Sequence, residues 1–468
     1  MFYRNGRPAM KAHAIVVGGS IAGLLAARVL SDHFERVTIV DRDALPDSPE
    51  PRQGTPQAAH VHVLLRGGLL IMQRLFPQLD DDLAQAGALS LNWTRDLVTF
   101  TCAGWSPRFD SEYTTRTCSR GLLEQMIRRQ VDAIGNITTA ARCEAIEPQA
   151  AETRSVFTGL KVHDRNRSDN ALVELAADLI VDASGRTSKG LNWLAALGYA
   201  APEETVINAR VGYATRVYRR PANFNADWKA MMVRTRPPFG LRGGLIYPIE
   251  NDQWMVNVAG AGAEQPPTDE ALFLEFIRNL IHPALYEAVK DAEPISPLHA
   301  YQRTENRLRH FERLTRWPEN FVVLGDAACA FNPTYGQGMS VAALEAQALD
   351  RWLRTSQSTL AFQQQLMQVI RGPWLMATNE DSRLPHVEGA TSSRFDKLYQ
   401  RYIDEFIWLC GSDPRALNIF MGVTHLVKPP TAMLAPTMAL KVMRRMIRPG
   451  PLQGKASDPV PAWQAVTG

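Results

Sequence analysis

The sequence AIVVGGSIAGLLAA at Ala14–Ala27 joins a run of apolar residues to a glycine turn and a helix start of small residues. A βαβ unit needs this order, because a tight turn must bring the amino end of a helix against a pyrophosphate. Gly18 supplies the turn, and Gly23 lets helix and strand approach closely. Ser20 replaces the middle glycine of G-x-G-x-x-G, and its hydroxyl group can donate to a phosphate. The stretch therefore predicts a Rossmann-type turn that binds a dinucleotide.

The next predicted strand, Val37–Val40, ends in an acidic residue. The fingerprint expects an acid about 20 residues past the glycines, where it binds a ribose hydroxyl. Asp41 occupies that place, and Arg42 beside it is a further candidate for cofactor binding. A glycine turn without a ligand is the alternative, but the strand, the helix start and the acid together favour the dinucleotide. We find no second such fingerprint, so we expect no second Rossmann domain for a nicotinamide.

The composition is that of an ordinary globular protein: of 468 residues, 45% are hydrophobic and 21% charged, and the formal net charge is +3. This near-neutral balance gives no support for nucleic acid as a partner. Five cysteines without metal-ligand spacing favour a reducing cytoplasm and predict no metal site. No stretch reaches the roughly 18 uninterrupted apolar residues of a membrane span, so we expect a cytoplasmic protein that at most contacts a membrane surface.

The pattern along the chain predicts an α/β fold: a Rossmann-type domain, an inserted, mainly β domain and a C-terminal helical region. After the β-rich part, the strand-then-helix order returns, so we expect the chain to re-enter the first domain. The predicted divisions are the cofactor-binding domain at 10–90, a strand insertion over the active site at 91–117, the cofactor-binding domain again at 118–192, a β-sheet substrate domain at 193–300, the third part of the cofactor-binding domain at 301–355 and the helical region at 356–468.

A second signature follows in the third part of this domain. FVVLGDAA at Phe321–Ala328 reads as a buried strand that ends in Gly-Asp, and FNPTYGQGMS at Phe331–Ser340 reads as a loop that opens a helix. The pair resembles the Gly-Asp motif of the group A FAD-dependent monooxygenases, the superfamily of para-hydroxybenzoate hydroxylase and squalene epoxidase, whose FAD-binding domain is GR2-like. The resemblance implies FAD as the cofactor. It also implies that Asp326 binds the ribityl chain and that Pro333 lies beside the isoalloxazine ring.

The same resemblance implies that the turn formed by Gly336, Gly338 and Met339 presents backbone N–H groups to the pyrimidine end of the ring. The chemistry agrees, because reduced flavin carries negative charge there and a helix start offers unpaired donors and a positive dipole. Arg120, which opens a predicted helix, resembles the arginine that touches the flavin side chain in this superfamily. Ser184 replaces the acid of the family's Asp-Gly motif, which is linked to flavin and NAD(P)H contacts. This replacement favours a separate flavin reductase over direct use of NADPH.

A narrower resemblance is carried by several segments within residues 14–350. They are similar to the squalene-epoxidase-like enzymes that epoxidise polyene polyketides in polyether pathways, and they include Pro56-Gln57, His60–Leu64, Trp193–Ala201, Gly212–Arg216 and Tyr247–Glu250. The resemblance implies epoxidation of an alkene in a secondary metabolite. The chain beyond about residue 355 resembles these enzymes only loosely.

Three weaker features leave alternatives open. His60 and His62 would face the same side of a strand, but no third ligand supports a metal site, so a structural role or a flavin-proximal role for His62 remains. Gln337, inside the glycine turn, is another flavin-proximal candidate, while no catalytic residue is assigned. The basic, Met- and Leu-rich stretch Leu417–Met446 could lie on a membrane, or could cover the substrate cavity, which its prolines favour.

The expected activity follows from the implied cofactor. Reduced FAD would react with O2 to give a C4a-hydroperoxide that transfers one oxygen atom to a small apolar substrate: an olefinic polyketide, a terpenoid or an aromatic compound. NAD(P)H would supply the electrons, directly or through a separate flavin reductase. Aromatic hydroxylation, alkene reduction of the geranylgeranyl-reductase type and lipid binding without turnover are the alternatives. A halogenase is disfavoured, because no lysine lies between Lys11 and Lys161 and no Trp-x-Trp segment occurs.

Overall fold

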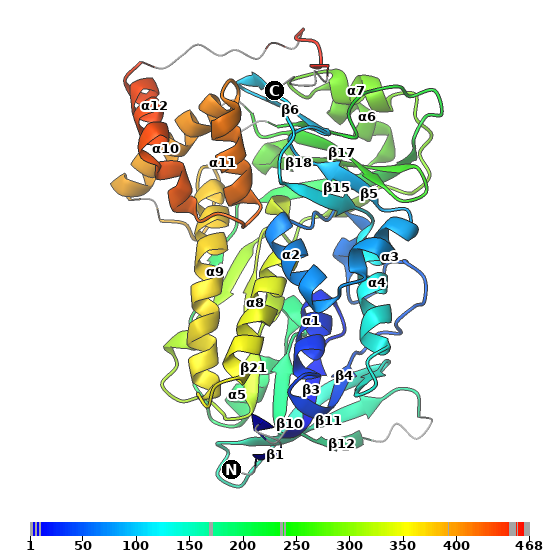
Figure 1. Ribbon diagram of the computed structural model, residues 1–468, viewed down its shortest axis with the longest axis vertical. Coiled ribbons are helices and arrows are strands. Elements are labelled where there is room, and N and C mark those ends of the chain that lie inside the picture. Colours follow the sequence, from blue (N-terminus) through cyan, green and yellow to red (C-terminus); the bar gives the residue numbers. More distant parts are fainter. Residues whose placement is uncertain are drawn as a thin grey trace.

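The computed structural model describes residues 3–4, 7–8, 11–167, 172–234, 237, 240–391, 393–448, 455 and 457–462. A five-stranded parallel sheet forms the core of one end of the molecule (Figure 1), in the order β21-β13-β3-β4-β9. Its strands are β3 (Lys11–Val17), β4 (Phe34–Val40), β9 (Ile137–Ala140), β13 (Leu179–Asp182) and β21 (Phe321–Val323). Most of their residues are buried, as a parallel sheet covered on both faces requires.

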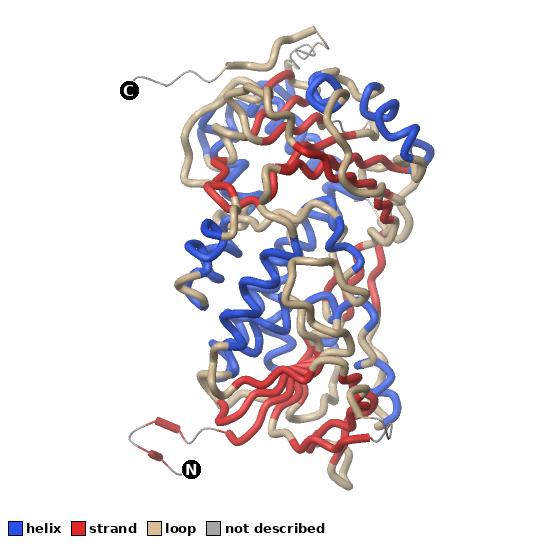
Figure 2. Tube along the Cα trace, turned by 90° about the vertical axis from the view of Figure 1, so that its right-hand side faces the viewer, coloured by secondary structure: helices blue, strands red, loops and turns tan. Residues whose placement is uncertain are grey.

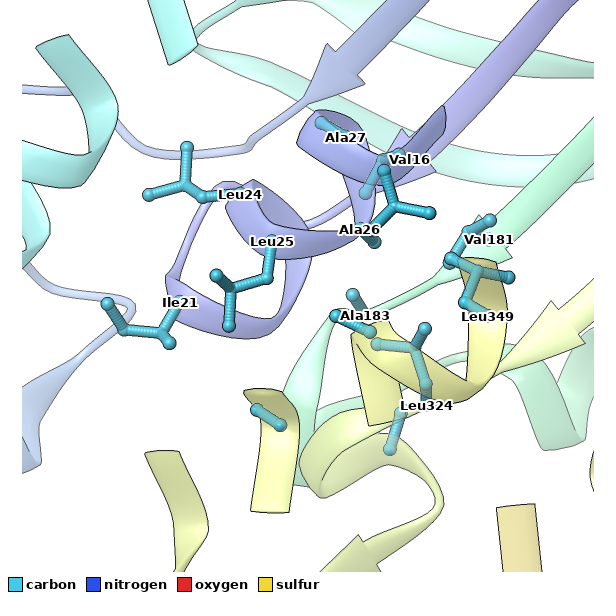
Figure 3. Packing of buried hydrophobic residues seen from close by; sticks show 14 of the residues in the cluster. Val16, Ile21, Leu24, Leu25, Ala26, Ala27, Val181, Ala183, Leu324 and Leu349 are labelled. Atoms are coloured by element: carbon cyan, nitrogen blue, oxygen red, sulfur yellow. The ribbon is translucent and has the colours of Figure 1, made fainter. Parts of the chain in front are cut away.

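Helices cover one face of this sheet, and the antiparallel sheet β10 (Cys143–Ala150), β11 (Phe157–Asp164) and β12 (Leu172–Ala176) packs against β4 and β13. The covering helices are α1 (Ile21–Leu30), α4 (Arg120–Asp132) and α8 (Gly338–Leu353). Small residues let α1 lie close to its neighbours. Figure 3 shows side chains of α1 clustered with Val16 of β3, Val181 of β13 and Leu349 of α8. This apolar cluster fixes the amino ends of α1 and α8 relative to the strand ends.

A seven-stranded mixed sheet dominates the other end of the molecule (Figures 1 and 2), in the order β19-β15-β18-β17-β16-β6-β7. Its strands are β6 (Leu97–Thr101), β7 (Gly104–Trp105), β15 (Val211–Arg219), β16 (Ala230–Val233), β17 (Gly243–Ile249), β18 (Gln253–Ala261) and β19 (His299–Tyr301). The helices α6 (Glu270–Arg278) and α7 (Ala284–Val289) bury Phe273, Phe276 and Leu285 against one face of it. The segment 91–117 contributes β6 and β7 to this sheet, because β6 pairs in parallel with β16.

The chain also forms shorter elements. They are α2 (Arg66–Leu75), α3 (Leu79–Gln85), β5 (Leu89–Asn92), β8 (Thr114–Thr117), α5 (Gly190–Ala196), β14 (Glu204–Ile207), β20 (Asn306–Arg309) and β22 (Cys329–Ala330). β21 and α8 lie late in the sequence but belong to the first domain, since β21 pairs with β13 and α8 packs on α1.

The C-terminal region is helical. Its helices are α9 (Thr359–Asp381), α10 (Arg394–Cys410), α11 (Pro414–Thr424) and α12 (Pro436–Ile447), and α9 runs beside α8 (Figure 1). Within the described ranges, no helix is both long and apolar enough to cross a membrane. The predicted fold class, a Rossmann-type domain with an inserted β domain and a C-terminal helical region, is confirmed.

Candidate functional site

The glycine turn after β3 can be built only with glycine at two positions. Gly18 has a φ of +104°, and a Cβ there would lie 2.5 Å from the carbonyl oxygen of Ala183. A Cβ on Gly23 would lie 1.8 Å from the carbonyl oxygen of Gly18. The first backbone bond of α1 runs from Leu24 N–H to Ser20 C=O (2.9 Å). The N–H groups of the preceding three residues therefore stand outside the helix ladder at the amino end, where an anion binds.

The acid at the end of β4 holds this turn in place. Asp41 Oδ2 accepts the Gly19 N–H at 2.6 Å, and Oδ1 accepts the Asp43 N–H at 2.8 Å. Arg52, which is almost buried, pairs with both Asp41 (3.3 Å) and Asp43 (2.8 Å). Arg42 is half-exposed and lies 3.8 Å from Asp43. Asp41 is thus placed beside the turn as expected, while ribose binding by Asp41 and cofactor binding by Arg42 remain predictions.

Ser20 belongs to a buried charged cluster that the sequence analysis missed in part. Its hydroxyl group donates to Glu124 Oε2 and accepts from the Arg120 guanidinium, both at 2.8 Å. Glu124 also pairs with Arg120 (2.8 Å) and Arg52 (3.0 Å). Burial acts to raise the pKa of Glu124, but the two arginines outweigh it and lower the pKa to about 2. The Ser20 hydroxyl proton is therefore engaged within the protein, and a Ser20–phosphate bond remains a prediction.

The Gly-Asp turn lies directly against the start of α1. Gly325 has a φ of +64°, and a Cβ there would lie 2.8 Å from the Ala22 Cβ. The side chain of Asp326 is 42% exposed, and its closest charged partner is Arg186 at 3.9 Å. Desolvation by the surrounding protein raises the pKa of Asp326, while the charges of Arg186 and Arg120 act to lower it. This carboxylate can accept hydrogen bonds from a polyol such as a ribityl chain.

A buried acid on α8 supports the Gly-Asp turn. Glu345 Oε2 accepts the Gly325 N–H at 2.6 Å, and burial raises the pKa of Glu345 to about 8. The nearby Asp326 acts in the same direction, whereas the Gly325 hydrogen bond acts to lower this pKa. At neutral pH, Glu345 is therefore mostly uncharged, and Asp326 is the acid of this pair that faces outward.

The loop from Pro333 to Gly338 forms the start of α8, and two of its features point to a ligand. Gln337 is buried, and its Oε1 has no hydrogen-bond partner within the described part of the chain. A Cβ on Gly338 would find open space, with no described heavy atom within 4 Å. Gly336, at φ +65°, reverses the chain in front of the helix, and Met339 is buried behind it. The loop thus offers the unpaired Gln337 oxygen, the N–H groups at the start of α8 and open space at Gly338. Together these features fit the polar, planar end of a flavin.

The Ser184 turn is stabilised by a carboxylate that the sequence analysis did not single out. Asp182 is fully buried at the end of β13 and accepts the Ser184 hydroxyl proton at 2.5 Å, and it also accepts the Ser188 hydroxyl proton. Gly185 follows with a φ of +81°. The next side chain, Arg186, donates to the backbone oxygens of Glu305 (3.0 Å) and Phe331 (2.7 Å). It thereby links this turn to the loop that carries Pro333.

The two histidines of the 60–64 segment differ from the strand geometry considered for them, because residues 61–65 form neither helix nor strand. His60 is buried against the β domain, with Nδ1 2.9 Å from Thr215 Oγ1 and its ring 4.6 Å from that of Tyr213. His62 lines a small pocket together with Arg120 and Cys118. Burial lowers the pKa of His60 to about 3 and that of His62 to about 4, so both rings are neutral at pH 7.

The C-terminal region reaches this part of the molecule. The Arg66 N–H donates to His425 Nδ1 at 3.0 Å, and the Gly67 N–H donates to the His425 carbonyl oxygen at 2.9 Å. Burial lowers the pKa of His425 to about 3, so its ring is neutral and can accept. Beside it, the Leu65 N–H donates to Ser340 Oγ at 3.1 Å. The starts of α2 and α8 are therefore fixed together.

Comparisons with known proteins agree with this geometry. A family model described as an FAD binding domain matches residues 11–358. The chain is 31% identical over 438 residues to Protein Rv3254 of Mycobacterium tuberculosis, covering 89% of this chain and 90% of that protein. A flavoprotein/dehydrogenase from Cytophaga hutchinsonii has a similar structure, with a TM-score of 0.65, 15% identity, and coverage of 93% of this chain and 99% of that one.

Two further solved structures show the same fold. The flavin-dependent brominase Bmp2 has a TM-score of 0.64 at 14% identity, covering 94% of this chain and 100% of that one. PqsL, a probable FAD-dependent monooxygenase of Pseudomonas aeruginosa, has a TM-score of 0.55 at 16% identity, covering 87% and 99%. The chain thus belongs to the FAD binding domain family.

Proposed function

We propose that this protein is an FAD-dependent monooxygenase that epoxidises an alkene in an apolar substrate, with hydroxylation of an aromatic ring as the second choice. When bound and reduced, FAD would supply an electrophilic oxygen atom derived from O2, and the second oxygen atom would leave as water. The contribution of the protein is to hold the cofactor, aim the substrate and exclude bulk water.

The observation that carries this proposal is an apolar wall beside the loop of α8. Tyr247, Ile249 and Met255 of the β domain are buried together, and Val63 packs against them. Val63 also adjoins the loop, because a Cβ on Gly336 would lie 3.4 Å from the Val63 Cβ. This cluster is buried, and it places apolar side chains next to the loop that is expected to hold the flavin. Such a surface suits an uncharged olefin or ring better than a small carboxylic acid, which needs a fixed cation.

Neutral side chains continue the wall. The stacked rings of Tyr213 and Tyr301, 5.3 Å apart, lie beside His60, and burial raises the pKa of both phenols. Because His60 is also neutral, this part of the wall adds hydrogen-bonding groups without charge. Substrate oxygens on an otherwise apolar molecule could be bound here.

Labelled oxygen tests the proposal. The FAD-loaded protein is reduced, supplied with ¹⁸O2 and offered a polyene and a phenol of similar size, with bromide included in a parallel reaction. One labelled oxygen atom in an epoxide supports the first choice, and one in a diphenol supports the second. A brominated product, or a product without label, would contradict both.

Electron supply is proposed to come through a separate flavin reductase, because Ser184 stands where direct NADPH users carry an acid. In this structure, the Ser184 hydroxyl group is directed to Asp182. We expect NADPH alone to reduce the bound flavin slowly in stopped flow. Reduction at several per second, within the usual range of about 1–10³ s⁻¹ for turnover, would contradict the reductase proposal.

A further inference from the structure

One buried carboxylate of the C-terminal region accepts hydrogen bonds from three side chains that support the start of α8. Asp381, the last residue of α9, is fully buried and lies outside the family-matched residues 11–358. Its Oδ1 accepts from the Tyr335 hydroxyl group at 2.5 Å and from Asn332 Nδ2 at 3.1 Å. Its Oδ2 accepts from Asn306 Nδ2 at 2.5 Å and from Asn332 Nδ2 at 3.2 Å.

These donors belong to the loop that precedes α8 and to its support. Asn332 and Tyr335 are in the loop itself, and Asn306 is the first residue of β20. Asn306 Oδ1 in turn accepts the backbone N–H of Asn332 at 2.7 Å, and Asn332 Oδ1 accepts that of Thr334 at 3.1 Å. A single carboxylate therefore fixes both ends of the 332–335 turn, two residues before the orphaned Gln337 and the open space at Gly338.

We propose that Asp381 is a positioning residue for FAD: through Asn332 and Tyr335, it sets where the first N–H groups of α8 stand relative to the flavin ring. The inference depends on the FAD site and not on which substrate is oxidised. It assigns to the C-terminal helices a direct part in cofactor binding.

The charge of Asp381 is available for this task near neutral pH. Burial raises the pKa of Asp381 to about 6, and the donors Tyr335, Asn332 and Asn306 act to lower it. Hydrogen bonds to a charged group are roughly twice as strong as neutral ones, so the ionised carboxylate holds the loop more firmly than an amide would. Asp381→Asn keeps the shape of the side chain but replaces one acceptor oxygen by an NH2 group. This group would face the donors that the carboxylate binds, Asn306, Asn332 and Tyr335.

The test compares Asp381→Asn with Glu388→Gln, a loss of charge elsewhere in the C-terminal region, where the exposed carboxylate pairs with Arg210. The dissociation constant for FAD is measured by fluorescence titration of the apoprotein. The reduction potential and the visible spectrum of the bound flavin are then recorded at saturating FAD.

For Asp381→Asn, we expect the FAD dissociation constant to rise by about tenfold to a hundredfold, the range of a lost charge-assisted hydrogen bond. The potential and spectrum of the remaining bound flavin should also shift, which a loss of stability alone would not produce. Glu388→Gln should leave all three readouts unchanged within about twofold of the wild type, since exposed ion pairs contribute little.

Tyr335→Phe removes one of the donors and keeps the test decisive if Asp381→Asn does not fold. It should raise the FAD dissociation constant by about threefold to tenfold, in line with a single hydrogen bond, and shift the flavin spectrum in the same direction. The proposal is overturned if Asp381→Asn and Tyr335→Phe both bind FAD with wild-type affinity and potential, or if Glu388→Gln changes them as much as Asp381→Asn does.

Discussion

Replacing the buried acid of α8 by its amide, Glu345→Gln, should make stability less dependent on pH. The pKa of Glu345 is about 8 in the folded protein, against an ordinary value of 4.5. A raised carboxyl pKa contributes stability that is fully present below 4.5 and is lost as the pH rises through about 8. At about 1.4 kcal/mol for each pH unit in that window, the loss totals roughly 3–5 kcal/mol between pH 5 and pH 9.

The assay is urea unfolding of the FAD-loaded wild type and Glu345→Gln at pH 5 and pH 9, followed by tryptophan fluorescence. Between pH 5 and pH 9, the free energy of unfolding of the variant should rise by roughly 3–5 kcal/mol relative to that of the wild type. The reason is that glutamine keeps an acceptor for the Gly325 N–H and never ionises. Glu293→Gln, at an exposed carboxylate paired with Arg219, is the control and should show no such gain. The reasoning would be refuted if the difference in unfolding free energy between variant and wild type were the same at pH 5 and pH 9 to about 1 kcal/mol. A shift of one pKa unit is worth about that much.

Three further outcomes are expected at the cofactor site. Asp326→Ala should weaken FAD binding by about tenfold to a hundredfold in a fluorescence titration, because a charge-assisted bond is lost, and an unchanged dissociation constant would mean that the ribityl site lies elsewhere. Gly23→Ala places a Cβ 1.8 Å from a backbone oxygen, which should cost about 1–3 kcal/mol or more of folding stability. We therefore expect a lower melting temperature and a lower FAD content, and wild-type values of both would contradict the close approach. FAD should be released when the protein is denatured, and flavin that stays on the precipitated chain would rule out non-covalent binding.

The glycine fingerprint could be predicted because its requirements are local. Gly18 and Gly23 follow a strand at fixed spacing, and both positions exclude a side chain in the structure. The strand boundaries were less exact: β4 begins at Phe34 rather than Val37, because the pairing with β3 continues to that residue. Short apolar patterns indicate where a strand lies but not where its pairing ends.

The supporting acids could not be predicted in the same way. Glu345 and Asp381 meet the Gly-Asp strand and the 332–335 loop only after the chain has folded, and nothing in their sequence surroundings distinguishes them from surface acids. Glu124 did carry a signal, since it lies four residues after Arg120 on a helix, where opposite charges pair. Arg52 had none, because it lies in an irregular segment.

His425 limits how this protein can be divided or recombined. A gene that ends with the family-matched segment at residue 358 would encode a chain that lacks acceptors for the Arg66 and Gly67 N–H groups. Where a foreign segment still buries these donors without offering acceptors, each unpaired donor costs about 1–3 kcal/mol. Chimaeras between relatives should therefore exchange the start of α2 and the segment around His425 as one inherited unit, even though some 360 positions separate them in the sequence.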